Sequence, residues 1–269
     1  MPTTAAVSCH SLTIRVPGRT LVDALDMEVA DGDFLAVLGQ NGAGKTLTMH
    51  TIAGLLTADG GHVELNGMPL ASLKRQHVAR RLALLPQYVE DVFPTTVLET
   101  VMIGRHPHIG AFELESAADR EIARQSLEQV DLAEFSARDI STLSGGERRR
   151  VAIAQVLTQA TGIYLLDEPT NHLDPQHQLD VLEVFADQAQ EGSAVIANLH
   201  DVNLAVRFAN RCLLLYGDGR WEIGDTASVL DEQRLTELYG TKMEAIRWRD
   251  RDIFMATSSD STSPPCGGL

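Results

Sequence analysis

The chain of 269 residues has few cysteines, no long apolar run and a deficit of positive charge. Its cysteines, Cys9, Cys212 and Cys266, are scattered and odd in number, so they form no metal-binding or redox spacing and suit a reducing compartment. No apolar stretch approaches the ~18 residues of a membrane span. The N-terminus lacks the basic start and apolar run of a signal peptide. We therefore expect a cytosolic chain that reaches a membrane only through a partner.

Acidic residues outnumber basic ones, 37 to 22, which gives a formal net charge of −15. This average field repels polyanions such as nucleic acid and anionic lipid surfaces, so we expect no nucleic-acid partner. The hydrophobic fraction of 44% is typical of a globular protein, and the length allows one large domain or two small ones.

The segment Gly39-Gln-Asn-Gly-Ala-Gly-Lys-Thr46 fits the spacing G-x-x-x-x-G-K-[ST]. It follows an apolar run at 34–38, which predicts a buried strand, and it precedes apolar residues with helical spacing. Here glycines let successive N–H groups point at a polyphosphate, and the helix start adds positive potential. Lys45 would reach the β- and γ-phosphates, and the Thr46 hydroxyl would bind Mg²⁺. The predicted nucleotide-binding residues are Gly39, Gln40, Asn41, Gly42, Ala43, Gly44, Lys45 and Thr46.

The elements around this loop predict a mixed α/β fold. Apolar and acidic residues alternate over 25–29, which indicates a half-solvated antiparallel strand, and the sequence 63–67 indicates a hairpin. Residues from about 97 to 156 have helical character and interrupt the alternation of strands and helices, so we expect a separate helical subdomain. The predicted boundaries are a nucleotide-binding domain at 1–249, with its core at 1–87 and 159–249 and the helical subdomain at 88–158, and a tail at 250–269 that is disordered by composition.

Leu143-Ser-Gly-Gly-Glu147 precedes a segment of helix-forming composition, and Glu147 follows Ser144 at the spacing of a capping box. Two glycines at a helix start leave its first N–H groups open, which makes an anion site of Ser144, Gly145 and Gly146. A capped helix without a further role is the alternative. We interpret the arginines at 148–150 as a solvated helix face rather than as a polyanion site.

Two further apolar runs, at 163–166 and 194–197, end in polar residues. Open α/β sheets place their ligands at the C-terminal ends of the strands. Asp167 is therefore suited to hold Mg²⁺, and Glu168 is suited to polarise an attacking water. A histidine at the end of a core strand is by default structural. The neighbouring strand ends favour a chemical role for His200.

In their order along the chain, the nucleotide loop, Gln87, Leu143–Glu147, Asp167-Glu168 and His200 resemble the ATP-binding subunit of ABC transporters, over about residues 7–245. The resemblance implies a P-loop NTPase (RecA-like) core with an antiparallel β subdomain and an inserted helical subdomain. It also implies a head-to-tail homodimer that encloses two ATP molecules. Each ATP would lie between the loop of one subunit and Ser144, Gly145 and Gly146 of the other.

The resemblance gives roles to single residues. Gln87 resembles the glutamine that senses Mg²⁺ and the water and links them to the membrane subunit. Glu168 resembles the general base, and His200 resembles the switch histidine on the γ-phosphate. Asp174 matches the loop that communicates across the dimer. The implied magnesium ligands are Thr46, Gln87 and Asp167, and the implied catalytic residues are Glu168, His200 and Lys45.

The sequence departs from the family pattern at two positions. Val16 stands where an aromatic residue usually stacks on adenine, so we expect low selectivity among nucleotide bases. Leu47 stands where a second hydroxyl residue usually contacts the α-phosphate, so we expect weaker ATP affinity than usual.

The segments 96–108, 199–204 and 237–240 resemble the ATPases that serve iron–siderophore, haem and cobalamin uptake. The resemblance implies a place at the cytoplasmic face of the inner membrane, permease subunits as partners and, indirectly, a substrate-binding protein. The segment from Tyr88 to Arg105 would receive the permease. The alternatives are an ABC ATPase that serves another cargo or export, a soluble ABC ATPase that works on nucleic acid or ribosomes, and an ordinary P-loop kinase or GTPase.

Overall fold

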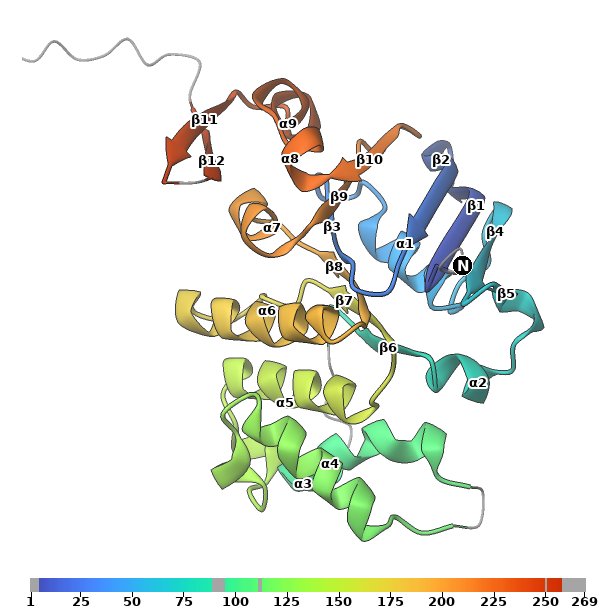
Figure 1. Ribbon diagram of the computed structural model, residues 1–269, viewed down its shortest axis with the longest axis vertical. Coiled ribbons are helices and arrows are strands. Elements are labelled where there is room, and N and C mark those ends of the chain that lie inside the picture. Colours follow the sequence, from blue (N-terminus) through green and yellow to red (C-terminus); the bar gives the residue numbers. More distant parts are fainter. Residues whose placement is uncertain (1–4, 89–94, 111–112, 250, 258–269) are drawn as a thin grey trace, which may run out of the picture.

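The computed structural model describes residues 5–88, 95–110, 113–249 and 251–257 (Figure 1). At its centre lies a six-stranded sheet in the order β10-β9-β3-β8-β7-β6. Five of these strands are parallel, and β10 runs antiparallel to β9. The strands are β3 (Phe34–Leu38), β6 (Leu82–Leu85), β7 (Ile163–Asp167), β8 (Ala194–Asn198), β9 (Arg211–Leu215) and β10 (Trp221–Asp225).

A second, four-stranded antiparallel sheet has the order β2-β1-β4-β5. Leu25, Met27 and Val29 are buried while Asp26 and Glu28 are exposed, which confirms the predicted half-solvated strand. The predicted hairpin is formed by β4 and β5. The strands are β1 (Val7–Val16), β2 (Arg19–Val29), β4 (Gly60–Leu65) and β5 (Met68–Pro69).

The central sheet is apolar on both faces, as expected for parallel strands that are covered on both sides. On one face, Leu35 and Val37 pack with the antiparallel sheet and with α1 (Lys45–Ile52). On the other face, Ala36 and Leu38 join the core cluster that includes the remaining long helices. Those helices are α3 (Val97–Met102), α4 (Ala117–Glu128), α5 (Gly145–Thr158), α6 (Pro175–Gln190), α7 (Val202–Phe208) and α9 (Glu232–Tyr239), and the short helices are α2 (Arg75–Ala79) and α8 (Thr226–Val229).

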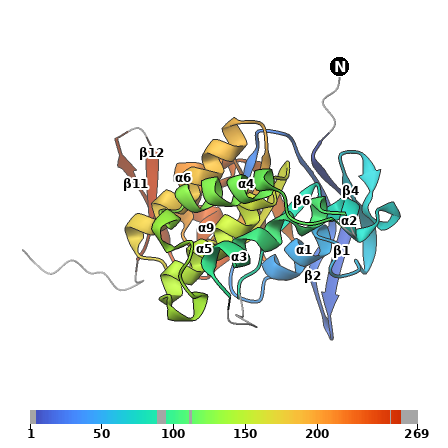
Figure 2. The ribbon, with the colours of Figure 1, turned by 90° about the horizontal axis from the view of Figure 1, so that it is seen from below.

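The helical subdomain predicted from the sequence is present at one end of the molecule. Helices α3, α4 and α5 pack on one another, and α5 returns the chain to the central sheet at β6 and β7. Figure 2 shows these helices in front, with β1, β2 and β4 to one side and the hairpin β11–β12 to the other. Among the described residues, the 3₁₀ turns are η1 (Leu70–Ser72), η2 (Ile103–His108), η3 (Ala133–Phe135) and η4 (Ile140–Thr142).

The predicted start of the disordered tail, at residue 250, lies too early in the chain. Strand β12 (Arg251–Ala256) pairs with β11 (Met243–Trp248) in an antiparallel hairpin. Phe254 is buried, and the Asn203 side chain both donates to its carbonyl at 3.1 Å and accepts from its N–H at 2.9 Å. These long-range contacts order the segment, although its composition alone gives little indication of a strand. The rest of the predicted tail, 258–269, lies outside the described residues.

Candidate ATP-binding and hydrolysis site

The C-terminal ends of neighbouring parallel strands bring most of the predicted site residues together. The loop 39–46 follows β3, Gln87 follows β6, and Asp167-Glu168 ends β7. A cleft of about 390 Å³ lies over this edge of the sheet. Its lining combines the nucleotide loop and the two other strand ends with the antiparallel sheet, through Val16, Arg19, Leu21, Asn41, Gly42, Gly44, Lys45, Thr46, Leu47, Gln87 and Glu168.

The start of α1 is built to receive an anion. Gly44 caps the helix with a φ of 103°, a left-handed conformation that favours glycine, and no side chain occupies the first N–H groups. Lys45 is buried, and its Nζ donates to the carbonyls of Gly39 at 2.7 Å and Gln40 at 3.2 Å. Burial lowers the pKa of Lys45, while the nearby carboxylates of Glu168 and Asp167 oppose that shift. Open N–H groups and an ammonium thus share one side of the cleft.

Glu168 stands at the centre of a polar ring. Its carboxylate accepts from Gln87 Nε2 at 2.8 Å and lies 2.6 Å from His200 Nε2, and it also accepts from Asn171 Nδ2. Burial raises the pKa of Glu168, but the hydrogen bonds from His200 and Gln87 outweigh it, and the net shift is downward. The carboxylate therefore stays ionised at neutral pH. Its backbone has a φ of 51°, a strained conformation for a residue with a side chain.

Asp167 is fully buried beside Glu168. Its Oδ1 accepts from Asn198 Nδ2 at 2.6 Å, while its Oδ2 has no hydrogen-bond partner among the described residues. A buried carboxylate oxygen without a partner is costly, and oxygen is the ligand atom that Mg²⁺ prefers. The residues present therefore fit a magnesium ion at this position.

Arg149 in α5 is a site residue that we did not predict. It is buried, and its guanidinium donates to the carbonyls of Pro86 at 2.7 Å, Asp167 at 2.8 Å and Glu168 at 2.7 Å. Burial lowers its pKa to about 10, although Asp167 and Glu168 oppose the shift. Arg149 thus joins the end of β6 to the strained turn at the end of β7.

The interpretation of the arginines at 148–150 as a solvated face is therefore wrong for Arg149, whereas Arg148 and Arg150 are partly exposed. Arg148 donates to the Ser141 carbonyl at 2.7 Å, and Arg150 donates to the Val130 carbonyl at 3.0 Å. Helix α5 is apolar on nearly all sides from Val151 to Leu157, which is typical of an interior helix. That pattern could have indicated that an arginine within one turn of it is buried.

The second predicted anion site lies elsewhere in the chain. Ser144 caps α5, and Glu147 completes the predicted capping box. The helix start borders a separate hollow of about 200 Å³ with Asp174, and this hollow shares no lining residue with the nucleotide cleft. Gly145 is exposed, with open space where a Cβ would lie. Within one chain, Ser144, Gly145 and Gly146 do not join the loop 39–46.

The two departures from the family pattern both border the cleft. Val16 ends β1, and Leu47 packs from α1 against the core below. Arg19, which we did not predict, donates from Nε to the Gly217 carbonyl at 2.6 Å and from Nη2 to the Gly42 carbonyl at 3.5 Å. It fastens the antiparallel sheet to the nucleotide loop. The only local sequence feature that could have indicated this role is the positive charge of Arg19 directly after the turn that follows Val16.

The fold and the cleft define a P-loop nucleotide-binding domain. The sequence profile of the family described as ABC transporter matches residues 22–171, and the chain belongs to this family as its ATP-binding, ATP-hydrolysing subunit. In the described part of the chain, no helix has the length and hydrophobicity that a membrane crossing needs.

Relatives and a solved structure match most of the chain. A hemin import ATP-binding protein of Myxococcus xanthus is 40% identical over 86% of this chain and 88% of its own length. A cobalamin import ATP-binding protein of Halobacterium salinarum is 36% identical over 86% of this chain and 58% of its own length. A solved structure described as an inward-facing conformation of a metal-chelate type ABC transporter has 28% identity and a TM-score of 0.83, covering 95% of this chain and 98% of that one.

Proposed function

We propose that this chain powers import of a metal chelate of the haem, cobalamin or iron–siderophore type. Among these cargoes we favour haem. The relatives named above support this cargo class, because they are named for hemin and cobalamin import. The chain would act at the cytoplasmic face of the membrane as a homodimer beneath permease subunits, which a substrate-binding protein would supply with cargo.

The observation that carries the proposed chemistry is the ring of polar groups around Glu168. The ionised carboxylate would orient the attacking water and accept its proton, since it is held from both sides by Gln87 and His200. The His200 side chain is exposed beside Glu168, and its ring would contact the γ-phosphate. Lys45 would leave the carbonyls of the loop for the β- and γ-phosphates and stabilise the charge that develops there.

The unpaired Asp167 oxygen supports a magnesium ion held by Thr46, Gln87 and Asp167. When bound, Mg²⁺ neutralises phosphate charge in the transition state. The Asn198 amide fixes the other Asp167 oxygen, so the free oxygen keeps one direction.

The separation of the two anion sites supports a dimer. The start of α5 is exposed and shares no lining residue with the cleft of its own chain. In a head-to-tail dimer, Ser144, Gly145 and Gly146 of one subunit would close on the γ-phosphate held by the other. ATP would favour the closed pair, and hydrolysis would release it. An ordinary P-loop kinase or GTPase offers no use for a second anion site.

The permease would contact the surface around Tyr88 to Arg105. Gln87 lies at the edge of this surface, and its side chain donates a hydrogen bond to Glu168. A displacement of the surface would therefore be transmitted to the hydrolysis site through this hydrogen bond. The described part of that surface comprises Tyr88, residues 95–96, α3 and the start of η2, and both Tyr88 and Ile103 are exposed large apolar residues. Residues 89–94 of the predicted face lie outside the described residues.

Uptake of labelled haem, cobalamin and an iron–siderophore chelate in cells that lack this chain tests the proposal. We expect loss of haem uptake, restored by the wild-type chain and not by Glu168→Gln. Glu128→Gln, which changes an exposed carboxylate of α4 that does not line the cleft, is the matched control and should restore uptake. Normal uptake of all three chelates in the deletion strain would contradict the cargo and leave the ATPase assignment standing.

A further inference from the structure

Two neighbouring strands of the antiparallel sheet place three metal-ligating side chains on one face. His10 in β1 and His62 in β4 are direct partners in the strand register, so their side chains leave the sheet on the same side. Glu64 follows His62 by two residues and shares its face. Val63 and Leu65 alternate with these residues and are buried in the core, so the three polar side chains lie on the solvent side.

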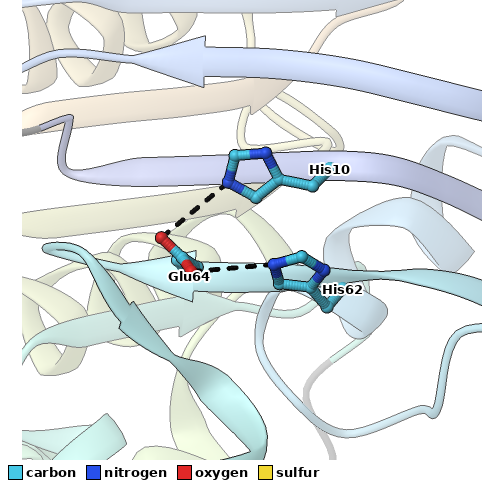
Figure 3. Close-up of side chains that lie close together, drawn as sticks. All are labelled: His10, His62 and Glu64. Carbon is cyan, nitrogen blue, oxygen red and sulfur yellow. Dashed lines mark ion pairs between the residues drawn. The ribbon is translucent and has the colours of Figure 1, made fainter.

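The ligand atoms of this cluster converge (Figure 3). His10 Nε2 lies 3.8 Å from one Glu64 oxygen, and His62 Nε2 lies 3.6 Å from the other. The two rings are stacked with centroids 4.8 Å apart, and the ligand atoms all lie within 4.8 Å of one another. The nitrogen–oxygen distances exceed those of hydrogen bonds. In the part of the chain that the structure describes, no hydrogen bond joins these side chains to another protein group.

These distances are close to those of a metal site without its metal. Zinc bonds of about 2.0–2.2 Å in a tetrahedron separate the ligand atoms by about 3.3–3.5 Å. The ligand atoms of the cluster lie within 4.8 Å of one another, so side-chain rotations that bring them about 1 Å closer together would complete the site. We propose that His10, His62 and Glu64 bind one divalent transition-metal ion of the Zn²⁺ class. Imidazole ligands favour Zn²⁺, Cu²⁺ or Ni²⁺ over Mg²⁺ and Ca²⁺. Solvent would supply the remaining ligand.

The backbone under the cluster holds the ligands in place. A Cβ on Gly61 would lie 2.2 Å from the His10 carbonyl oxygen and 2.3 Å from that of Ser11, so only glycine lets β4 approach β1 this closely. The Ser11 N–H also donates to Asp26 Oδ1 of β2 at 2.8 Å. Ligands on paired strands keep their geometry better than ligands on loops.

The cluster has no equivalent among the described residues. No other set of three His, Cys, Asp or Glu side chains there brings its ligand atoms as close together. The site is distinct from the nucleotide cleft, since none of its residues lines that cleft. A bound ion would bridge β1 and β4 in the sheet that also carries Val16, and would stabilise the folded chain by mass action.

Calorimetric titration of the metal-stripped full chain with Zn²⁺ tests the proposal. We expect one equivalent of Zn²⁺ in the wild-type chain, and at least a tenfold loss of affinity in His10→Ala, His62→Ala and Glu64→Gln. His77→Ala removes an exposed histidine from α2 and should leave the binding unchanged.

Thermal unfolding provides a second readout. Zn²⁺ should raise the unfolding temperature of the wild-type and His77→Ala chains. It should not change the unfolding temperature of Glu64→Gln. Glu64→Gln keeps the shape of an outward-facing side chain, so its fold and ATP affinity should match the wild type. Equal Zn²⁺ affinity in wild type and Glu64→Gln, or an equal loss in His77→Ala, would overturn the proposal.

Discussion

The first N–H groups of α1 and of α5 differ in whether a side chain caps them. At α1, Gly44 provides no side-chain cap, and the first turn holds no acidic residue. At α5, Ser144 and Glu147 form a reciprocal capping box. The first start opens into a cleft beside the buried ammonium of Lys45, whereas the second is exposed on a separate hollow. The two sequences look like two anion sites, but only the first is complete in one chain.

Electrostatics strengthens the contrast. Lys45 adds positive charge at the first start, whereas Glu147 adds negative charge at the second. The hydrogen bonds with Ser144 lower the pKa of Glu147, so its charge is present at neutral pH. A single chain is therefore expected to bind ATP through α1. The start of α5 would contribute only when a partner's nucleotide brings the phosphate to it.

One helix connects both regions. Helix α5 begins at Gly145, directly after the Ser144 cap, and it carries Arg149, whose guanidinium donates to the Glu168 carbonyl of the same chain. A phosphate that docks at the start of α5 would therefore act on an element that touches the hydrolysis site of its own subunit. The predictions below separate the two regions.

The largest expected effect is at Glu168. Glu168→Gln should slow ATP hydrolysis roughly 10²–10⁴-fold, because an amide cannot accept the proton of the attacking water. ATP affinity should stay near the wild-type value, since Lys45 and the loop are untouched. Steady-state turnover and nucleotide titration measure the two quantities. Full turnover in Glu168→Gln would remove its role as general base, and Glu128→Gln, at an exposed carboxylate outside the cleft, serves as the control.

Arg149→Ala should destabilise the fold by about 3 kcal/mol, because it leaves several buried carbonyls without a donor. That loss corresponds to a fall of roughly 6–12 °C in the unfolding midpoint. Arg149→Lys should fall between wild type and alanine, since an ammonium lacks the planar fork. Arg124→Ala, at an exposed arginine with one 3.8 Å ion pair, should change stability by no more than about 0.5 kcal/mol. Equal midpoints for Arg149→Ala and Arg124→Ala would refute this account of Arg149.

Ser144→Ala and Ser116→Ala form a matched pair, because both serines cap a helix through a capping box. Each should cost about 1 kcal/mol of stability. Only Ser144→Ala should also reduce ATP turnover, by roughly 10–100-fold, the value of a lost hydrogen bond to a charged group. Chemical denaturation and turnover assays measure the two effects. The same turnover in both variants would reduce Ser144 to a helix cap.

The smallest effects are expected at the rim of the cleft. Without an aromatic residue at position 16, the wild-type chain should bind ATP and GTP with similar affinity. Val16→Tyr should tighten ATP binding by roughly 2–10-fold, through stacking worth about 0.5–1.5 kcal/mol. Leu47→Thr should also tighten it by adding a hydroxyl beside the phosphates. A strong preference of the wild type for ATP, seen by competition titration, would contradict the expected low base selectivity.

The sequence was sufficient where a short pattern carries the chemistry. The loop 39–46 and the acidic pair after β7 depend on local spacing and on strand ends, and the structure brings them together. Arg149 could not be predicted in the same way, because its acceptors lie 18 to 63 positions away along the chain. The hairpin β11–β12 was missed for a similar reason, since the contacts of Phe254 with Asn203 are set by tertiary packing.

The size of the Glu168→Gln chain in solution, measured by light scattering with and without ATP and Mg²⁺, tests the central claim most directly. If α5 completes the site of a second subunit, the chain should be monomeric without ATP and dimeric with it. Adding Ser144→Ala should weaken the dimer, whereas adding Ser116→Ala should not. A chain that binds ATP with unchanged affinity and remains monomeric would contradict the account, because the α5 start would then have no nucleotide to bind.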